Sequence, residues 1–201
     1  MFDLKTLLIL VLALPLAAAL GTFAFGPRLM RGRSHAPVVV ALVLSFVASV
    51  MLIFQVRGLI DEQAAYMQGA HPNGVNRVYE IWSWANVPDA MPVPNEQLAA
   101  TAWGDFNIGV SLRADPLTAV MLAMVTCISA LVAVYSVGYM RGDAGYWRFF
   151  AYIGLFVFSM NLLVSASNFL LLYVGWELVG LCSYLLIGFW YEKPAAAAAG
   201  K

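Results

Sequence analysis

Charged side chains are scarce in this sequence. Only 11% of the 201 residues are Asp, Glu, Lys or Arg, against roughly a quarter in an average soluble domain. The eleven basic and eleven acidic residues cancel, so no field of one sign favours nucleic acid or an anionic substrate. Hydrophobic residues make up 62% of the chain. This composition predicts no nucleic-acid partner and indicates a protein surrounded by the lipid bilayer.

Cysteine and histidine are equally sparse. Cys127 and Cys182 both fall within apolar runs and show no CxxC spacing, so neither a disulfide nor a metal site is indicated. His35 and His71 lie in different predicted loops. The sequence also lacks a phosphate-binding loop, a dinucleotide fingerprint, a nucleophile elbow and a zinc motif. Catalysis of the kind found in soluble enzymes is not expected.

Long apolar runs are abundant, in contrast. A helix needs about 20 residues to cross a hydrocarbon core about 30 Å thick. Arg148, near the start of one run, is tolerable because Tyr146 and Trp147 beside it are typical interfacial anchors and a long cationic side chain can reach the headgroups. We therefore expect an all-α polytopic membrane protein with five transmembrane helices, at Thr6–Phe25, Ala36–Val56, Pro116–Gly138, Tyr146–Ser165 and Phe169–Trp190.

The first run has two interpretations. The small residues at 17–19 resemble the cleavage site of a signal peptide. Asp3 offsets Lys5 before the run, however, and the arginines follow it. A retained helix is therefore the preferred interpretation.

The same arginines predict an orientation. Short loops rich in Lys and Arg stay on the cytoplasmic side. Such loops follow the first and third runs, at 28–33 and 140–148. We therefore expect the N-terminus and the 57–115 segment outside, and the C-terminus inside.

The 57–115 segment is the largest predicted extramembrane part. Turn-forming residues dominate "HPNG" and "VPDAMPVPNE", which predicts loops there. "VYEIWSW" and "FNIGVSLRA" read as strands, and the second alternates apolar and polar residues as expected when one face packs. The sequence predicts a small β-hairpin on the outer face. Asp115 and Pro116 then form a strong start for the third helix.

One carboxylate interrupts the last apolar run, "LLLYVGWELVGLCSYLLIGFW". Glu177 lies eight residues after Phe169, which places it about 12 Å inside the helix. An ionisable group at that depth costs about 2.5 to 3.5 kcal/mol, so it needs compensation. Tyr173, Gly180 and Tyr184 share its helix face and would leave room for hydrogen bonds and water. This pattern favours a proton relay at Glu177, with a structural carboxylate as the alternative.

A cation that pairs with Glu177 must come from outside the five runs, since none of them carries Lys or Arg at mid-membrane depth. Uptake and release of a proton would then follow the approach and retreat of that cation.

Four stretches carry a family resemblance: "SLRADPLTAVMLAMVT", "VYSVGYM", "RFFAYIGLFVFSM" and "WELVGLCSYLLIGFWYEKPAAAAAGK". They resemble the N-terminal portion of subunit L, the antiporter-like, mitochondrial subunit 5-type subunit of NADH-quinone oxidoreductase (respiratory complex I). The resemblance is specific from about Asn107 to Lys201 and extends to residues 1–106 only in hydropathy and loop layout. The chain thus has three expected parts: two transmembrane helices in 1–56, an extracytoplasmic loop with a hairpin in 57–115, and in 116–201 what the resemblance implies is the truncated start of a proton-translocating module.

The resemblance also implies roles and partners. It places the family's essential glutamate at Glu177 and its paired lysine on a later helix that this sequence does not reach. The expected function is coupling of NADH-to-quinone electron transfer to proton translocation in the membrane arm, in a bacterial plasma (inner) membrane. No cofactor is expected on this chain, with flavin and iron–sulfur clusters on partner subunits. The downstream helices would be supplied by a separate chain or be absent.

Two departures and two alternatives accompany this interpretation. The chain is much shorter than the family, and Ala133 stands where the family commonly has histidine. One alternative is a subunit of a multisubunit sodium/proton antiporter, although the complex I pattern is closer at four positions: Val179, Gly180, Cys182 and Tyr184. The other alternative is a truncated structural membrane protein that moves no ions.

Overall fold

The computed structural model describes residues 3–26, 31–66, 75–94 and 101–200. Within these ranges the regular secondary structure is helical apart from one antiparallel pair of strands, β1 and β2. The elements, in order, are α1 (Leu4–Phe25), the short 3-10 helix η2 (Arg31–Arg33), α2 (His35–Tyr66), β1 (Arg77–Pro94), β2 (Thr101–Ala114), α3 (Pro116–Tyr139), α4 (Tyr146–Ser165), α5 (Phe169–Ile187) and α6 (Pro194–Gly200).

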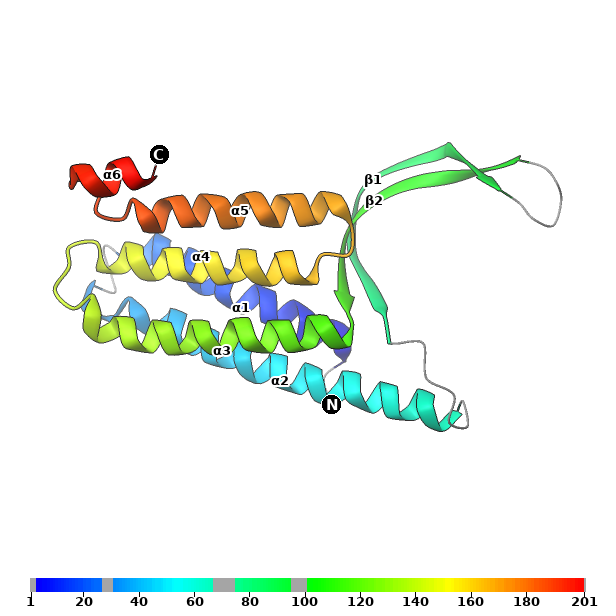
Figure 1. Cartoon of the computed structure of the whole chain (residues 1–201), viewed down its shortest axis with the longest axis horizontal. Coiled ribbons are helices and arrows are strands. Elements are labelled where there is room, and N and C mark those ends of the chain that lie inside the picture. Colours follow the sequence, from blue (N-terminus) through cyan, green and yellow to red (C-terminus); the bar gives the residue numbers. More distant parts are fainter. Residues whose placement is uncertain (1–2, 27–30, 67–74, 95–100, 201) are drawn as a thin grey trace.

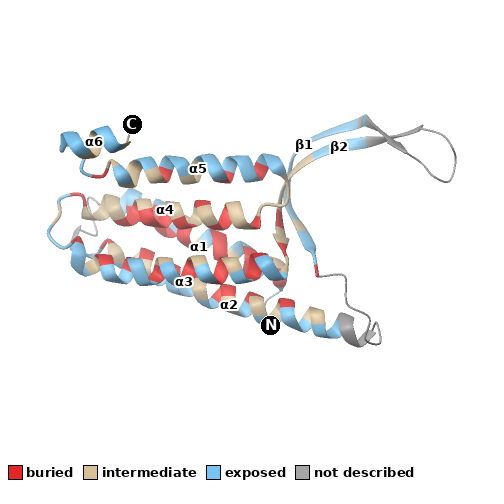
Figure 2. Cartoon of the chain, in the orientation of Figure 1, coloured by how far each residue is buried: buried red, intermediate tan, exposed pale blue. Residues whose placement is uncertain are grey.

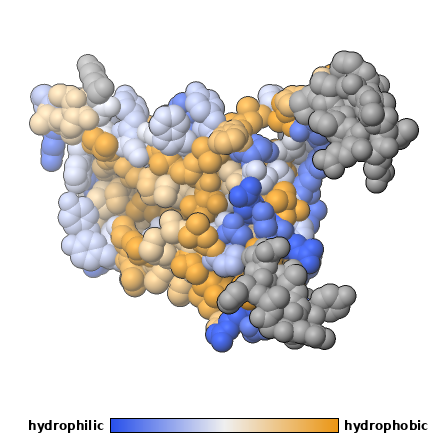
Figure 3. Space-filling model, turned by 45° about the vertical axis from the view of Figure 1, so that its right-hand side comes forward, coloured by the Kyte–Doolittle hydropathy of each residue, from blue (hydrophilic) through white to orange (hydrophobic). Residues whose placement is uncertain are grey.

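The five long helices lie side by side and the β-ribbon projects from one end of the bundle (Figure 1). α1 packs on α2 and α4, α3 packs on α2 and α4, and α5 packs on α4. All five are long and apolar enough to cross a membrane. On the face shown in Figure 3, hydrophobic residues gather over the middle of the bundle and hydrophilic residues nearer its ends. The predicted fold class, five spanning helices with a small hairpin, is confirmed.

Small residues let the central helices approach closely. A Cβ atom added at Gly154 in α4 would lie 3.1 Å from the Ala19 Cβ and 3.2 Å from the Pro15 carbonyl oxygen in α1. Buried residues lie on α1, α2, α3 and α4, which pack on one another (Figure 2). α5 is different, since only 17% of its most apolar stretch of 18 residues is buried, against 39 to 50% for the same stretch in the other four helices. It is the edge helix of the bundle.

Helix starts follow the sequence closely. Asp115 caps α3 by accepting a 2.6 Å hydrogen bond from the Thr118 amide, and Pro116 takes the first helical position, as predicted.

Two helix ends were predicted wrongly. α2 runs ten residues past the predicted Val56, because Leu59 and Ile60 still pack on the core while the charged residues of this segment face outward. α5 ends at Ile187 rather than at Trp190, because the chain turns at Gly188, whose amide bonds to the Tyr184 carbonyl.

The ribbon also departs from expectation. β1 runs through "VPDAMPVP", which was predicted to be a loop. Proline is acceptable there because both strands of a two-stranded ribbon are edge strands, and the pairing is irregular between Val87 and Met91. The predicted packed face of β2 exists only near the bundle, where Leu112 is 3% exposed, because the ribbon leaves the bundle and Phe106 is 41% exposed. "HPNG" lies outside the described residues.

Candidate functional site

The start of α5 is tied to the β-ribbon. The Asn168 side chain accepts a hydrogen bond from the Leu171 amide at 2.8 Å and so caps the helix. Its amide nitrogen also donates to the Gly109 carbonyl at 2.8 Å. Ser111 and Ser167 are bonded to each other through their hydroxyls, and the Ser167 amide donates to the Ser111 carbonyl at 3.2 Å. One turn of α5 and one segment of β2 therefore form a single anchored unit.

One side of α5 packs on α4. Leu171, Gly175 and Cys182 are its buried residues, and at about 100° per residue they share one face. A Cβ atom added at Gly175 would lie 3.0 Å from the backbone nitrogen and Cα of Leu163. The Cys182 thiol lies 3.8 Å from the Ser159 hydroxyl.

Glu177 lies on the opposite side of α5. Tyr173, Gly180 and Tyr184 share this side, and all four residues are exposed. The Tyr173 side chain interacts with the Glu177 carboxylate, while a Cβ atom at Gly180 would meet no atom within 4 Å. With α5 ending at Ile187, Glu177 is about 12 Å from one end of the helix and about 15 Å from the other. The structure thus brings the four predicted site residues together on one uncovered helix face.

Chemical partners of this face are few. Within residues 3–26, 31–66, 75–94 and 101–200, the structure places no Lys or Arg in a salt bridge with Glu177. Ala133 is fully buried in a hydrophobic cluster formed by residues of α1, α2, α3 and α4. Cys127 and Cys182 are both free, and the described part of the chain contains no group of three or more His, Cys, Asp or Glu that could hold a metal ion.

A buried polar cluster was missed by the sequence analysis. Pro15 has no N–H, so the Val11 carbonyl of α1 loses its helical partner. Two side chains replace it: Ser45 of α2 donates at 3.3 Å and Asn161 of α4 donates at 3.1 Å. Asn161 is fully buried and its Oδ1 has no hydrogen-bond partner in the structure. A proline in an apolar run was the signal, because it frees the carbonyl four residues earlier.

A second polar contact joins the ends of α2 and α4 that lie away from the ribbon. A hydrogen bond of 2.9 Å links the Tyr146 hydroxyl and His35 Nδ1. His35, which was predicted to lie in a loop, is the first residue of α2.

The α3–α4 loop is stabilised by Asp143. Its carboxylate accepts hydrogen bonds from Trp190 Nε1 at 2.9 Å and from the Gly145 amide at 2.7 Å. These bonds, that of Trp190 foremost, hold the pKa of Asp143 below its usual value because they stabilise the charged form.

The fold and this site define a class: a polytopic helical membrane protein that carries a carboxylate half-way along an edge helix. Two sequence families match the chain. Residues 101–150 match the family described as NADH-ubiquinone oxidoreductase (complex I), chain 5 N-terminus. Residues 166–201, which contain Glu177, match the family described as NADH:quinone oxidoreductase/Mrp antiporter, TM.

Individual relatives agree. NADH-quinone oxidoreductase subunit L of Escherichia coli (strain K12) is 49% identical over 119 residues, which are 59% of this chain and 17% of that protein. NAD(P)H-quinone oxidoreductase subunit 5, organellar chromatophore 1, of Paulinella chromatophora is 45% identical over 64% of this chain and 19% of its own length. The chloroplastic subunit 5 of Poa pratensis is 44% identical over 63% and 16%. The chain spans less than a fifth of the length of these curated relatives.

These matches confirm the predicted resemblance. The chain is related to the N-terminal portion of subunit L, the subunit 5-type component of NADH-quinone oxidoreductase.

Proposed function

We propose that this chain contributes to proton translocation in the membrane arm of NADH-quinone oxidoreductase, with Glu177 as a protonatable relay group. The observation that carries the proposal is the position of Glu177: half-way along α5, within the segment that matches the antiporter family, and on an uncovered face. The function is coupled to electron transfer from NADH to quinone on other subunits.

The exposed face supports this role by its energetics. A charged carboxylate facing hydrocarbon at this depth costs about 2.5 to 3.5 kcal/mol, so it is stable only when it is protonated or next to a cation. Tyr173, Gly180 and Tyr184 leave a polar, uncrowded surface around it. A lysine on a further helix would cover that surface, and movement of its charge would switch Glu177 between its two protonation states.

Glu177→Gln tests the relay directly, because it keeps size and hydrogen bonding and removes the charge. We expect assembled complex at normal levels and a loss of quinone-linked proton uptake in membrane vesicles. Glu177→Asp should retain part of the activity, since the carboxylate remains but retreats by one methylene. Glu192→Gln is the matched control, because Glu192 is an exposed carboxylate beyond the end of α5.

Normal proton uptake in Glu177→Gln would refute the relay role. Failure of that variant to assemble would instead support the structural carboxylate.

The proposed orientation places the N-terminus and the ribbon outside and the α3–α4 loop in the cytoplasm of a bacterial inner membrane, on the basis of the loop arginines. Asn86 in β1 and Ala144 in that loop are both exposed. In intact cells we expect an impermeant thiol reagent to label Asn86→Cys and to leave Ala144→Cys unlabelled. The reverse result would invert the topology.

Partners and cofactors follow from the same proposal. Other membrane-arm subunits would surround the chain, and flavin and iron–sulfur clusters would reside on separate subunits. Purification through a tag on this chain, followed by mass spectrometry, should recover redox subunits of the complex. Recovery of sodium/proton antiporter subunits would favour the alternative to which the second family description also refers.

A further inference from the structure

A cavity of about 750 Å³ lies at the end of the bundle away from the ribbon. Its walls come from the ends of α1, α2, α3 and α4 and from the α3–α4 loop. Its volume falls in the range of about 300 to 1,000 Å³ that is typical of small-molecule sites. The cavity is about 30 Å of helix away from the ribbon anchor and is separate from the Glu177 face, none of whose residues lines it.

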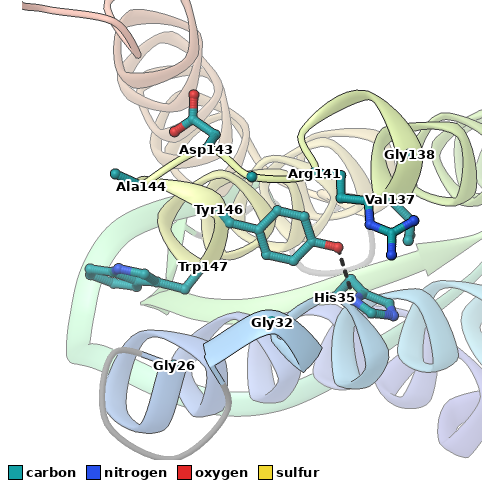
Figure 4. Close-up of a pocket in the computed structure, with 11 residues that line it drawn as sticks. Gly26, Gly32, His35, Val137, Gly138, Arg141, Asp143, Ala144, Tyr146 and Trp147 are labelled. Atoms are coloured by element: carbon teal, nitrogen blue, oxygen red, sulfur yellow. Dashed lines mark hydrogen bonds between the residues drawn. The ribbon is translucent and has the colours of Figure 1, made fainter.

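The lining chemistry favours an anion. Arg141 lines the cavity and is exposed, and no ion pair involving it is present among the residues that the structure describes. In Figure 4 the Arg141 guanidinium lies beside the Tyr146 hydroxyl and the His35 ring, which are hydrogen-bonded to each other. α4 begins at this cavity without a side-chain cap from its N-cap residue, Gly145. The Tyr146 amide bonds to the Asp143 carbonyl at 3.2 Å, so the amides that follow it in the first turn add the positive potential.

The one acidic group in the lining is already occupied. The Asp143 carboxylate points away from Tyr146 and His35 in Figure 4 and accepts hydrogen bonds from Trp190 and the Gly145 amide. It therefore leaves Arg141 available as the cavity's cation.

The cavity also has room for a headgroup. Cβ atoms added at Gly32, Gly138 and Gly142 would each meet no atom within 4 Å, so these three lining positions face open space. Gly142 has φ +91°, which turns the loop back beside Arg141 and which side-chain-bearing residues rarely adopt. Trp147, also in the lining, is a residue type enriched at headgroup depth.

We infer that this cavity binds a phosphate group that carries a negative charge, presented by the headgroup of an anionic phospholipid. Arg141 would pair with the phosphate, and amides of the first turn of α4 would donate hydrogen bonds. The Tyr146 hydroxyl donates to the phosphate as well when His35 Nδ1 is the donor in the bond between those two residues. Basic pockets between the ends of transmembrane helices suit such headgroups. This inference does not depend on the proposed function of Glu177.

The test uses the whole chain in detergent and phosphatidylglycerol with brominated acyl chains, which quench nearby tryptophan fluorescence. The signal of Trp147 is the difference between the chain and its Trp147→Phe variant. We expect saturable quenching by phosphatidylglycerol and a half-saturation concentration about five-fold higher for Arg141→Gln. Arg141→Lys should restore most of the affinity, and Gly138→Leu, which fills open space, should weaken it while leaving the charge in place.

Arg57→Gln is the matched control, because Arg57 is an exposed arginine near the ribbon end of α2 and does not line the cavity. It should bind like the unmodified chain. Inorganic phosphate is the second arm: no displacement of lipid at millimolar concentration assigns the site to the headgroup, whereas displacement assigns the same anion chemistry to free phosphate. Equal quenching of Trp147 by brominated phosphatidylcholine, with no effect of Arg141→Gln, would overturn the inference.

Discussion

The hydrogen bonds to the Val11 carbonyl lead to a quantitative prediction. Pro15 leaves this carbonyl without its helical donor, and Ser45 and Asn161 take its place. Asn161→Ala removes one of these bonds and also opens a cavity, because Asn161 is fully buried. Pro15→Ala restores a main-chain N–H at position 15, so the Val11 carbonyl no longer depends on Asn161. The two substitutions should therefore be coupled.

The coupling energy can be estimated from the structure. Asn161→Ala creates the same cavity with or without Pro15→Ala, so the cavity term cancels in a double-mutant cycle. The remainder is the hydrogen bond of 3.1 Å from Asn161 to Val11. Hydrogen bonds between transmembrane helices average about 0.6 kcal/mol and reach about 1.7 kcal/mol. We expect Asn161→Ala to lower the free energy of unfolding by about 1 kcal/mol less in the Pro15→Ala background.

Reversible unfolding of the chain in mixed micelles with increasing dodecyl sulfate, followed by far-ultraviolet circular dichroism, measures this difference. A matched cycle of Asn161→Ala with Ser136→Ala gives the baseline, because the Ser136 hydroxyl bonds within α3 to the Val132 carbonyl. A coupling below about 0.3 kcal/mol, the usual scatter for independent sites, would refute the reasoning.

Two further predictions concern α5 and the loop before α4. Gly175→Val should lower the free energy of unfolding by about 1 to 3 kcal/mol, because its Cβ would lie 3.0 Å from the Leu163 backbone. Gly21→Val is the control in the same assay, because its Cβ would meet no atom within 4 Å. Equal effects of the two substitutions would contradict the close packing of α5 on α4. Asp143 has a lowered pKa through its bond from Trp190, so its stabilisation is complete above its usual pKa, near 3.9, and is lost as the pH falls through the lowered value. Asp143→Asn should remove that loss of stability in an acid titration; an unchanged titration would show that Asp143 does not cause it.

The sequence predicted the elements that depend on local chemistry. The spans follow from hydropathy, the start of α3 follows from Asp115 and Pro116, and the shared face of Glu177 and Tyr184 follows from helical spacing. A ribbon was predicted, but not its extension through the prolines of β1, because strand pairing can override local turn preference when both strands are edges.

Long-range contacts could not be read from the sequence. The bonds from Ser45 and Asn161 to Val11 span 34 and 150 residues, and only the packing order of the helices brings them together. The same is true of the uncovered state of the Glu177 face. Spacing defines a face, but whether that face meets α4 depends on which side the packing of Gly175 and Cys182 selects.

The hydrogen bonds of Asn168 fix the position of the Glu177 carboxylate along α5 relative to the ribbon. Asn168 is bonded both to the first turn of α5 and to the Gly109 carbonyl of β2. Glu177 therefore lies nine residues along the chain from a residue that is held against the ribbon. One residue inserted between them would shift the carboxylate along the helix by about 1.5 Å and swing it by about 100°. It would leave the open side and approach the side that packs on α4. The number of residues between Asn168 and Glu177 thus limits the position of the carboxylate more strictly than the identity of most residues in that interval does. An insertion or deletion there would abolish the proposed relay without changing any residue of its face.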